Sequence, residues 1–292
     1  MSSTAIGASK TDRARLKRAR RRRQGSHVHA HVILVIGGFI MAAPFLWQIV
    51  MSLSSNAEVT SVPPTFFPSE LLFENYATVF EVIPFLSQLK VSVLITVIRV
   101  VAQVVLCTMA GYAFARMRFT GKGILFAVIL SILLVPSQVY LLSQYQLIQS
   151  LGLLDTVAGI VAPGLFSAFG TFLMRQFFLS LPAELEEAAR LDGANPFQTF
   201  WKVMLPLVGP AVSALTILTV LWSWSELLWP LVVSNEANAA PVSVGLALIA
   251  GVPLIDYPVL MAASAMAMAP ILILFLVMQR RVIEGLAFTG VK

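Results

Sequence analysis

The chain has 292 residues, of which 58% are hydrophobic and 12% charged, and its formal net charge is +6. An ordinary globular protein has about 25% charged residues, and a soluble fold of this size does not bury so much apolar surface. The single cysteine, Cys107, excludes an internal disulfide and a cysteine metal cluster. We therefore expect an all-α, polytopic membrane protein.

Six apolar stretches are long enough to cross a bilayer core of about 30 Å, which takes about 20 helical residues. The six stretches are Val32–Leu53, Val91–Ala115, Ile124–Ile148, Thr156–Met174, Leu205–Val233 and Tyr257–Met278. A seventh, Ala237–Ile255, is interrupted by Pro241 and Gly251 and holds few bulky apolar residues, so we do not expect it to span. The predicted organisation is a basic tail (1–31), a six-helix transmembrane domain (32–278) and a C-terminal tail (279–292).

Lysine and arginine are distributed unevenly about these spans. Of the 20 basic residues, 18 fall in the two tails and in the second-to-third and fourth-to-fifth connections. Because cytoplasmic segments of membrane proteins are enriched in Lys and Arg, we expect both termini to be cytoplasmic. The run Arg20–Arg23 is interpreted as part of a largely disordered anchor at the anionic inner leaflet, rather than as a nucleic-acid site. The tail does not have the pattern of a cleavable signal peptide.

The cytoplasmic segment 180–196 is the most informative part of the sequence. Ser180 is expected to cap a helix whose first turn holds Pro182, and Gly193 is placed to end that helix in a left-handed conformation. Asn195-Pro196 is typical of a new cap and first turn, which predicts a second short helix over Phe197–Val203. One face of the first helix is expected to form a low, smooth strip that another protein can approach closely; it consists of Leu185, Ala188, Ala189 and Asp192.

A spaced set of residues in this segment resembles the EAA loop of the membrane subunits of binding-protein-dependent ABC importers. The set is Glu187-Ala188-Ala189, Gly193, Val203 (where the family usually has Ile) and Leu205-Pro206. Five further stretches resemble the carbohydrate-importer branch and, within it, the G-type permease of maltose importers. They are 110–116, 134–136, 172–182, 191–194 and 279–285. Two departures, Val91-Ser92 and Trp224-Ser225-Glu226, lie toward the outer half of the membrane and weaken inference about the solute.

The resemblance implies a type I importer permease fold in a prokaryotic inner membrane, and a chain that forms half of the pathway for a sugar-like solute. Its implied partners are a second homologous permease, two ATP-binding-cassette ATPase subunits and an extracytoplasmic solute-binding protein. The implied ATPase-coupling residues are Glu187, Ala188, Ala189, Asp192 and Gly193. The sequence has no Gly-rich phosphate loop ending in Lys-Ser or Lys-Thr, so we expect no cofactor on this chain and place ATP and Mg²⁺ on the partner ATPase.

Two charged residues inside predicted spans are candidates for the translocation pathway. Arg99 is expected either to face a cavity or ion-pair partner, such as Glu226 or another chain, or to extend outward toward Lys90. Glu226 has Trp222, Trp224 and Trp229 near it in sequence. Such a group suits sugar stacking beside a carboxylate and equally suits an aromatic belt at the headgroups.

Two other protein classes fit the sequence less well. A secondary transporter or channel usually carries intramembrane carboxylates or inverted repeats, and the sequence shows only Glu226 near one end of a span. A membrane enzyme needs a catalytic cluster, which is not apparent. Zinc binding by His27, His29 and His31 is disfavoured because no acidic or thiol residues accompany them.

Overall fold

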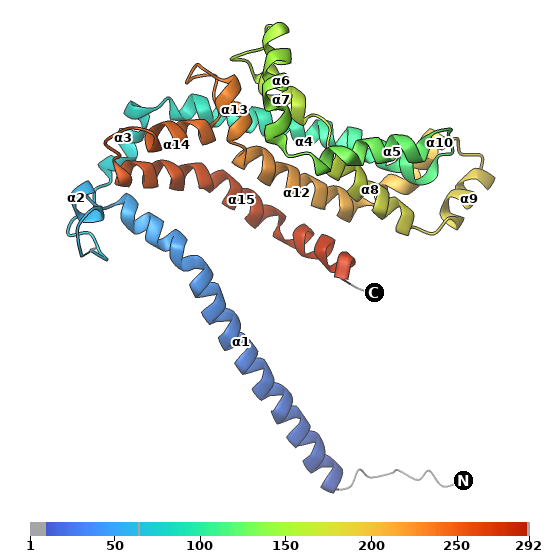
Figure 1. Ribbon diagram of the computed structural model, residues 1–292. Coiled ribbons are helices and arrows are strands. Elements are labelled where there is room, and N and C mark those ends of the chain that lie inside the picture. Colours follow the sequence, from blue (N-terminus) through green and yellow to red (C-terminus); the bar gives the residue numbers. More distant parts are fainter. Residues whose placement is uncertain (1–9, 64, 291–292) are drawn as a thin grey trace.

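The computed structural model describes the backbone of residues 10–63 and 65–290, and every regular element in that part of the chain is a helix (Figure 1). The side chains before Ala30, including the arginine run, His27 and His29, and those of the C-terminal tail 279–292 lie outside the described residues. The helices are α1 (Lys10–Ser52), α2 (Asn56–Val59), α3 (Glu74–Val82), α4 (Phe85–Arg116), α5 (Lys122–Ser131), η1 (Ile132–Leu134), α6 (Ser137–Ser150), α7 (Val157–Val161), η2 (Ala162–Gly164), α8 (Ala168–Ser180), α9 (Glu184–Leu191), α10 (Pro196–Gln198), η3 (Thr199–Met204), α11 (Leu205–Leu207), α12 (Gly209–Ser225), α13 (Leu228–Val233), α14 (Val242–Ala250) and α15 (Tyr257–Gly290).

Three helices are long and apolar enough to cross a bilayer unbroken, namely α4, Ala30–Ser52 of α1 and Tyr257–Val277 of α15. They correspond to the first, second and sixth predicted spans. Helix α1 begins at Lys10, so the tail predicted to be largely disordered is helical from that residue. Most of α1 runs away from the other helices, and its C-terminal end lies beside α15, where Gln48 Nε2 donates to Met261 O at 3.4 Å (Figure 1).

The other three predicted spans are bent rather than straight. The paired segments Lys122–Leu134 and Ser137–Ser150 meet at 103°, Val157–Gly164 and Ala168–Ser180 at 43°, and Pro196–Leu207 and Gly209–Ser225 at 76°. The described residues therefore contain up to six spans if each bent pair crosses as one unit. Helix α14 has only 9 residues, which confirms that the seventh apolar stretch is not one continuous spanning helix.

Each bend has a local chemical cause. Val135 precedes Pro136 and is extended (φ −97°, ψ 118°), as expected for a residue before proline. Ser167 starts a new helix, because its side chain accepts a hydrogen bond from the Gly170 N–H at 3.0 Å. Pro210 lies in the first turn of α12, and since proline lacks an N–H it cannot continue the preceding helical hydrogen bonds.

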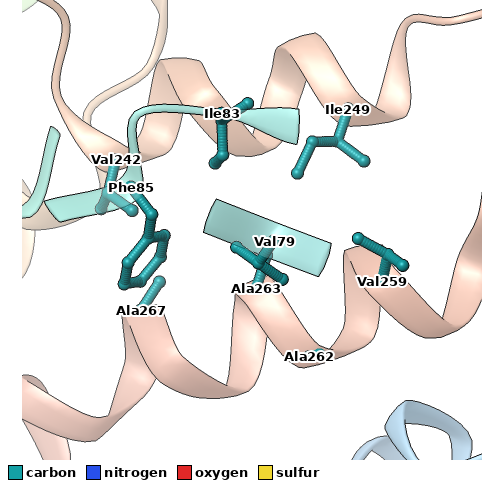
Figure 2. Packing of buried hydrophobic residues seen from close by; sticks show 9 residues of the cluster. All are labelled: Val79, Ile83, Phe85, Val242, Ile249, Val259, Ala262, Ala263 and Ala267. Atoms are coloured by element: carbon teal, nitrogen blue, oxygen red, sulfur yellow. The ribbon is translucent and has the colours of Figure 1, made fainter. Parts of the chain in front are cut away.

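Helix α4 is central, because it contributes to all three clusters of buried hydrophobic residues. Phe85 packs with α3, α14 and α15 in the cluster that Figure 2 shows from close by. Ile95 packs with α7 and α13. Cys107 and Tyr112 pack with α8, η3 and α12. A movement of α4 therefore affects the whole helical body.

Candidate functional site

The predicted coupling helix is α9, but it begins later than expected. Ser180 is the last residue of α8, and its hydroxyl donates to Phe177 O at 2.7 Å instead of capping α9. Leu181 is extended (φ −76°, ψ 144°), as a residue before proline usually is. Helix α9 starts at Glu184, and three glutamates in its first turn complement the helix dipole in place of a side-chain cap.

The end of α9 is built as predicted. Gly193 has a φ of +80°, and the Ala194 N–H donates to Ala189 O at 2.9 Å, which closes the helix through a left-handed turn. Asn195 and Gln198 then form a reciprocal capping box, with bonds of 2.8 and 3.0 Å. This turn aims the chain from α9 into α10 and the π-helical segment η3.

The strip predicted to be smooth and open is divided between two sides of α9. Ala188 and Asp192 are exposed and Leu185 is half-buried, whereas Ala189 is 7% exposed and packs inside this chain. The expectation that Ala189 is open to another protein is therefore wrong. The outward face consists of Glu184, Glu187, Ala188, Leu191 and Asp192.

The inward face of α9 holds a buried carboxylate that sequence reasoning did not single out. Glu186 is 6% exposed and lies between two guanidinium groups, with Arg116 at 3.7 Å and Arg190 at 3.8 Å. The signal available in the sequence was the Glu186–Arg190 spacing of four residues, which places the two side chains on one helix face. Arg116, at the end of α4, stands out in the sequence only as a basic residue of a connection and as the last residue of the stretch 110–116.

A second site lies deep in the helical body, where Arg99 pairs with Glu226. Arg99 Nη1 donates to Glu226 Oε2, and Nη2 donates to Ile160 O at 2.6 Å. A Cβ at Gly164 would lie 2.5 Å from Arg99 Nε, so the glycine makes room for the guanidinium. Arg99 is 5% exposed, which confirms the ion-pair alternative and excludes an outward extension toward Lys90.

Glu226 is placed by a helix break. It follows α12 in an extended conformation (ψ 124°), and α13 begins at Leu228, so the predicted continuous helix from Leu205 to Val233 is wrong here. The Glu226 side chain is 33% exposed and lines a cavity of about 550 Å³. Other polar lining residues are Arg99, Ser137, Tyr140 and Gln144.

The tryptophans near Glu226 in sequence do not gather around it as one cluster. Trp229 is 5% exposed and its indole N–H donates to Ile160 O at 3.2 Å, so it is a packing residue at the wall of the Glu226 cavity. Trp224 donates to Ala267 O at 3.1 Å and lines a separate cavity of about 420 Å³ between α12, α14 and α15. Trp222 is half exposed and meets Phe169 edge-on.

A stripe of buried polar residues on α4 also escaped sequence reasoning. Gln103 Nε2 donates to Gly164 O at 2.7 Å, and its Oε1 accepts from Thr219 at 2.9 Å. Ser92 accepts the Val242 N–H at 2.8 Å and so satisfies the first backbone donor of α14. The stripe consists of Gln88, Ser92, Thr96, Arg99 and Gln103, whose three- and four-residue spacing was the signal in the sequence.

Among the described side chains, no three His, Cys, Asp or Glu residues are grouped as a metal site. The geometry presents an exposed helix face on α9 and hydrogen-bonding groups at the Arg99–Glu226 cavity.

Comparison with known proteins agrees with this arrangement. Residues 30–286 match the family described as "Binding-protein-dependent transport system inner membrane component". The chain is 36% identical over 267 residues to the arabinooligosaccharides transport system permease protein AraQ of Halalkalibacterium halodurans, covering 89% of this chain and 96% of that protein. It is 31% identical to the sn-glycerol-3-phosphate transport system permease protein UgpE of Brucella abortus, covering 90% and 97%.

Among solved structures, a chain of a bacterial ABC transporter involved in the import of the acidic polysaccharide alginate is similar, with a TM-score of 0.73 and 26% identity, over 94% of this chain and 99% of that one. The fold is thus that of an ABC importer permease, an all-helical multi-pass membrane protein. The chain belongs to the family of binding-protein-dependent transport system inner membrane components. This membership sets aside the secondary transporter, channel and membrane-enzyme alternatives.

Proposed function

We propose that this chain forms half of the transmembrane pathway for an oligosaccharide or a related hydroxyl-rich solute. The relatives named above import arabinooligosaccharides, sn-glycerol-3-phosphate and alginate, all of which carry hydroxyl groups. The Arg99–Glu226 cavity supports the proposal, because the exposed carboxylate edge of Glu226 and the Ser137, Tyr140 and Gln144 side chains can exchange hydrogen bonds with hydroxyl groups. Trp224, at its separate cavity, is a further candidate for contact with the solute.

The second half of the pathway is assigned to a homologous permease, so that the pair is a heterodimer. Two ATPase subunits bind ATP and Mg²⁺, and an extracytoplasmic binding protein delivers the solute. The membrane arrangement is six spans with both termini in the cytoplasm. The charge asymmetry of the connections and the three unbroken and three bent spans support this arrangement.

Coupling to ATP hydrolysis is assigned to α9. Its outward face is short, regular and exposed, with Glu187, Ala188 and Asp192 available to a partner and Gly193 fixing its end. This exposed face, held against the helical body by its buried side, is the observation that carries the proposal.

Copurification in mild detergent followed by mass spectrometry tests the assembly. We expect a second permease and ATPase subunits with this chain, and no ATP hydrolysis by the chain alone. In proteoliposomes containing the complex and its binding protein, we expect uptake of arabinotriose or of sn-glycerol-3-phosphate that depends on ATP. ATP turnover by the isolated chain, or an assembly without ATPase subunits, would contradict the proposal.

A further inference from the structure

The Arg116 side chain connects the end of α4 to the segment that leads into the coupling helix. This residue is the last of α4. Its Nε and Nη2 donate to Phe178 O at 3.1 and 2.6 Å, and Nη2 also donates to Leu181 O. These carbonyl groups belong to the end of α8 and to the connection that leads into α9. Arg116 therefore fixes the position at which the chain enters the coupling helix.

The same guanidinium faces the buried carboxylate of α9. Arg116 Nε lies 3.7 Å from Glu186 Oε1, and the two side chains are 12% and 8% exposed. Glu186 Oε1 is buried and accepts no hydrogen bond from any described group. A buried carboxylate in this setting depends on neighbouring cations for its stability, and Arg190, its other cation, is 67% exposed. Arg116 is thus the more buried of the two cations beside this carboxylate.

Near Arg116, helices α4 and α8 are tightly packed against each other. Helices α4 and α8 pack so closely that a Cβ at Gly111 would lie 2.6 Å from Met174 Cβ. The Tyr112 ring of α4 packs edge-on against Phe178 of α8 and at a tilt against Phe200 of η3, with ring centroids 5.3 and 5.0 Å apart. Interiors packed this closely transmit displacements instead of absorbing them.

Helix α4 then leads directly to the proposed solute site. Arg99 lies 17 residues before Arg116 in the same unbroken helix, a separation of about 25 Å at 1.5 Å per residue. One unbroken helix therefore extends from the Arg116 contacts to the Arg99–Glu226 cavity.

We propose that Arg116 is a positioning residue that fixes coupling helix α9 to the cytoplasmic end of α4, so that displacement of α9 by an ATPase subunit moves α4 and its Arg99. The inference rests on the proposed docking of α9 to the ATPase. Its specific content is that α9 and the end of α4 move as one body, and that they separate when the Arg116 guanidinium is removed.

Distance measurement between two spin labels tests this directly. Nitroxides are attached to Thr120→Cys and Ala183→Cys in the full complex; both positions are exposed and lie outside the outward face of α9, and the native Cys107 is buried. Spectra are recorded without nucleotide and with ATP and vanadate. In the parent we expect one narrow distance distribution that is the same in both states. In Arg116→Gln we expect a broad distribution or one that changes with nucleotide.

Three further variants make the test specific. Arg118→Gln, an exposed arginine two residues away, should behave as the parent does. Arg116→Lys keeps a charged donor and should restore part of the narrow distribution. Glu186→Gln removes the buried charge with little change of shape, and it should broaden the distribution even if Arg116→Gln fails to assemble.

ATP hydrolysis by the same complexes supplies the functional readout. In Arg116→Gln, the stimulation of hydrolysis by binding protein loaded with arabinotriose or with sn-glycerol-3-phosphate, whichever the parent imports, should fall about tenfold, within the range of typical coupling between distant sites. The ATPase subunits should still copurify.

The possible failures are distinguishable. If the ATPase subunits do not copurify with the parent chain, the proposed function itself falls. If they copurify and Arg116→Gln gives the narrow distribution and full stimulation of the parent, only the role of Arg116 is overturned. A parent distance that changes with nucleotide also overturns it.

Discussion

Arg99 carries its charge at a buried position, and Glu226 is its only charged partner among the described side chains. Removing one partner of a buried pair costs about 3–5 kcal/mol, and the partial exposure of Glu226 places the expected loss for Glu226→Ala near the low end, at about 3 kcal/mol. Thermal unfolding of the complex, followed by size-exclusion chromatography of a fluorescent fusion, measures this. The exposed Glu70→Ala is the matched control.

Replacing both members of the pair separates stability from transport. Arg99→Met combined with Glu226→Leu should restore most of the lost thermal stability, because apolar residues of similar volume often replace a buried pair without cost. Solute uptake should stay low, since the cavity has lost its carboxylate. Full uptake by the double variant would mean that the pair serves packing alone.

Glu58 provides a pH-dependent contact in the connection after α1. Its carboxylate accepts hydrogen bonds from the backbone and side chains of Ser69 and Ser55. The Ser69 hydroxyl is the largest cause that lowers the Glu58 pKa from 4.5 to about 2. Because the folded pKa is depressed, the stabilisation is complete above about pH 4.5 and is lost as the pH falls toward 2.

The rate of pepsin cleavage at acid pH reports whether the Glu58 hydrogen bonds are intact. In the parent, cleavage within residues 55–69 should accelerate between pH 4.5 and 2.5 relative to cleavage within residues 235–239. In Glu58→Gln, which cannot ionise, the ratio of the two rates should be high at both pH values. A parent ratio that does not change with pH would show that Glu58 does not hold the connection.

At the scale of the element, the two alanines of α9 should respond differently to a long charged side chain. Ala188→Arg leaves the fold intact because Ala188 is exposed, and it should abolish copurification of the ATPase subunits while membrane abundance stays near that of the parent. Ala189→Arg forces a charge into a buried position, so it should lower abundance itself. Thr120→Arg, exposed outside α9, is the control, and quantitative immunoblotting of membranes and eluates measures both quantities.

Gly193 tests the end of the same helix through backbone conformation alone. A Cβ at this position meets no atom within 4 Å, but its φ is +80°. This conformation costs a non-glycine residue about 1–2 kcal/mol. It costs asparagine less, because asparagine tolerates the left-handed region. ATP-coupled uptake should therefore be highest in the parent, lower in Gly193→Asn and lowest in Gly193→Val. Equal uptake by all three would mean that the turn does not position α9.

The sequence predicted elements well where one residue type has one strong conformational preference. Gly193 and Asn195 marked the end of α9 and the start of α10 correctly, because both preferences are local. Ser180 was misassigned as a cap because the extended preference of Leu181 before Pro182 moved the start of α9. The contact of Arg116 with Glu186 joins segments 70 residues apart, and a periodic pattern carries no information about such a pairing.

At the scale of the whole molecule, apolar length predicted where the apolar helical segments lie better than it predicted their shape. Hydropathy reports transfer into lipid, which is summed over about 20 residues, and it is insensitive to a break that leaves composition unchanged. Hydropathy therefore does not predict the breaks beside Pro136 and Pro210. It also does not predict the extended conformation that places Glu226 at a cavity wall. At the bend near Gly164, side chains of α4 bond to the backbone, because Arg99 Nη2 donates to Ile160 O and Gln103 Nε2 donates to Gly164 O. Such side chains can satisfy the backbone groups that a break releases.

The membrane arrangement itself is tested by labelling single cysteines in intact cells and in inverted vesicles with an impermeant maleimide. Leu71→Cys and Ala237→Cys, both exposed in connections without basic residues, should react from outside. Thr120→Cys and Ala183→Cys, both exposed in connections rich in Lys and Arg, should react only in inverted vesicles. Cys107 is buried, so the parent should remain unlabelled on both sides. The physical reason is the preference of basic segments for the cytoplasmic side during insertion. Each of the three bent pairs counts as one crossing only if its two segments traverse the bilayer together. Reactivity of Ala183→Cys from outside would mean that one crossing is missing, and it would place α9 where no ATPase can reach it.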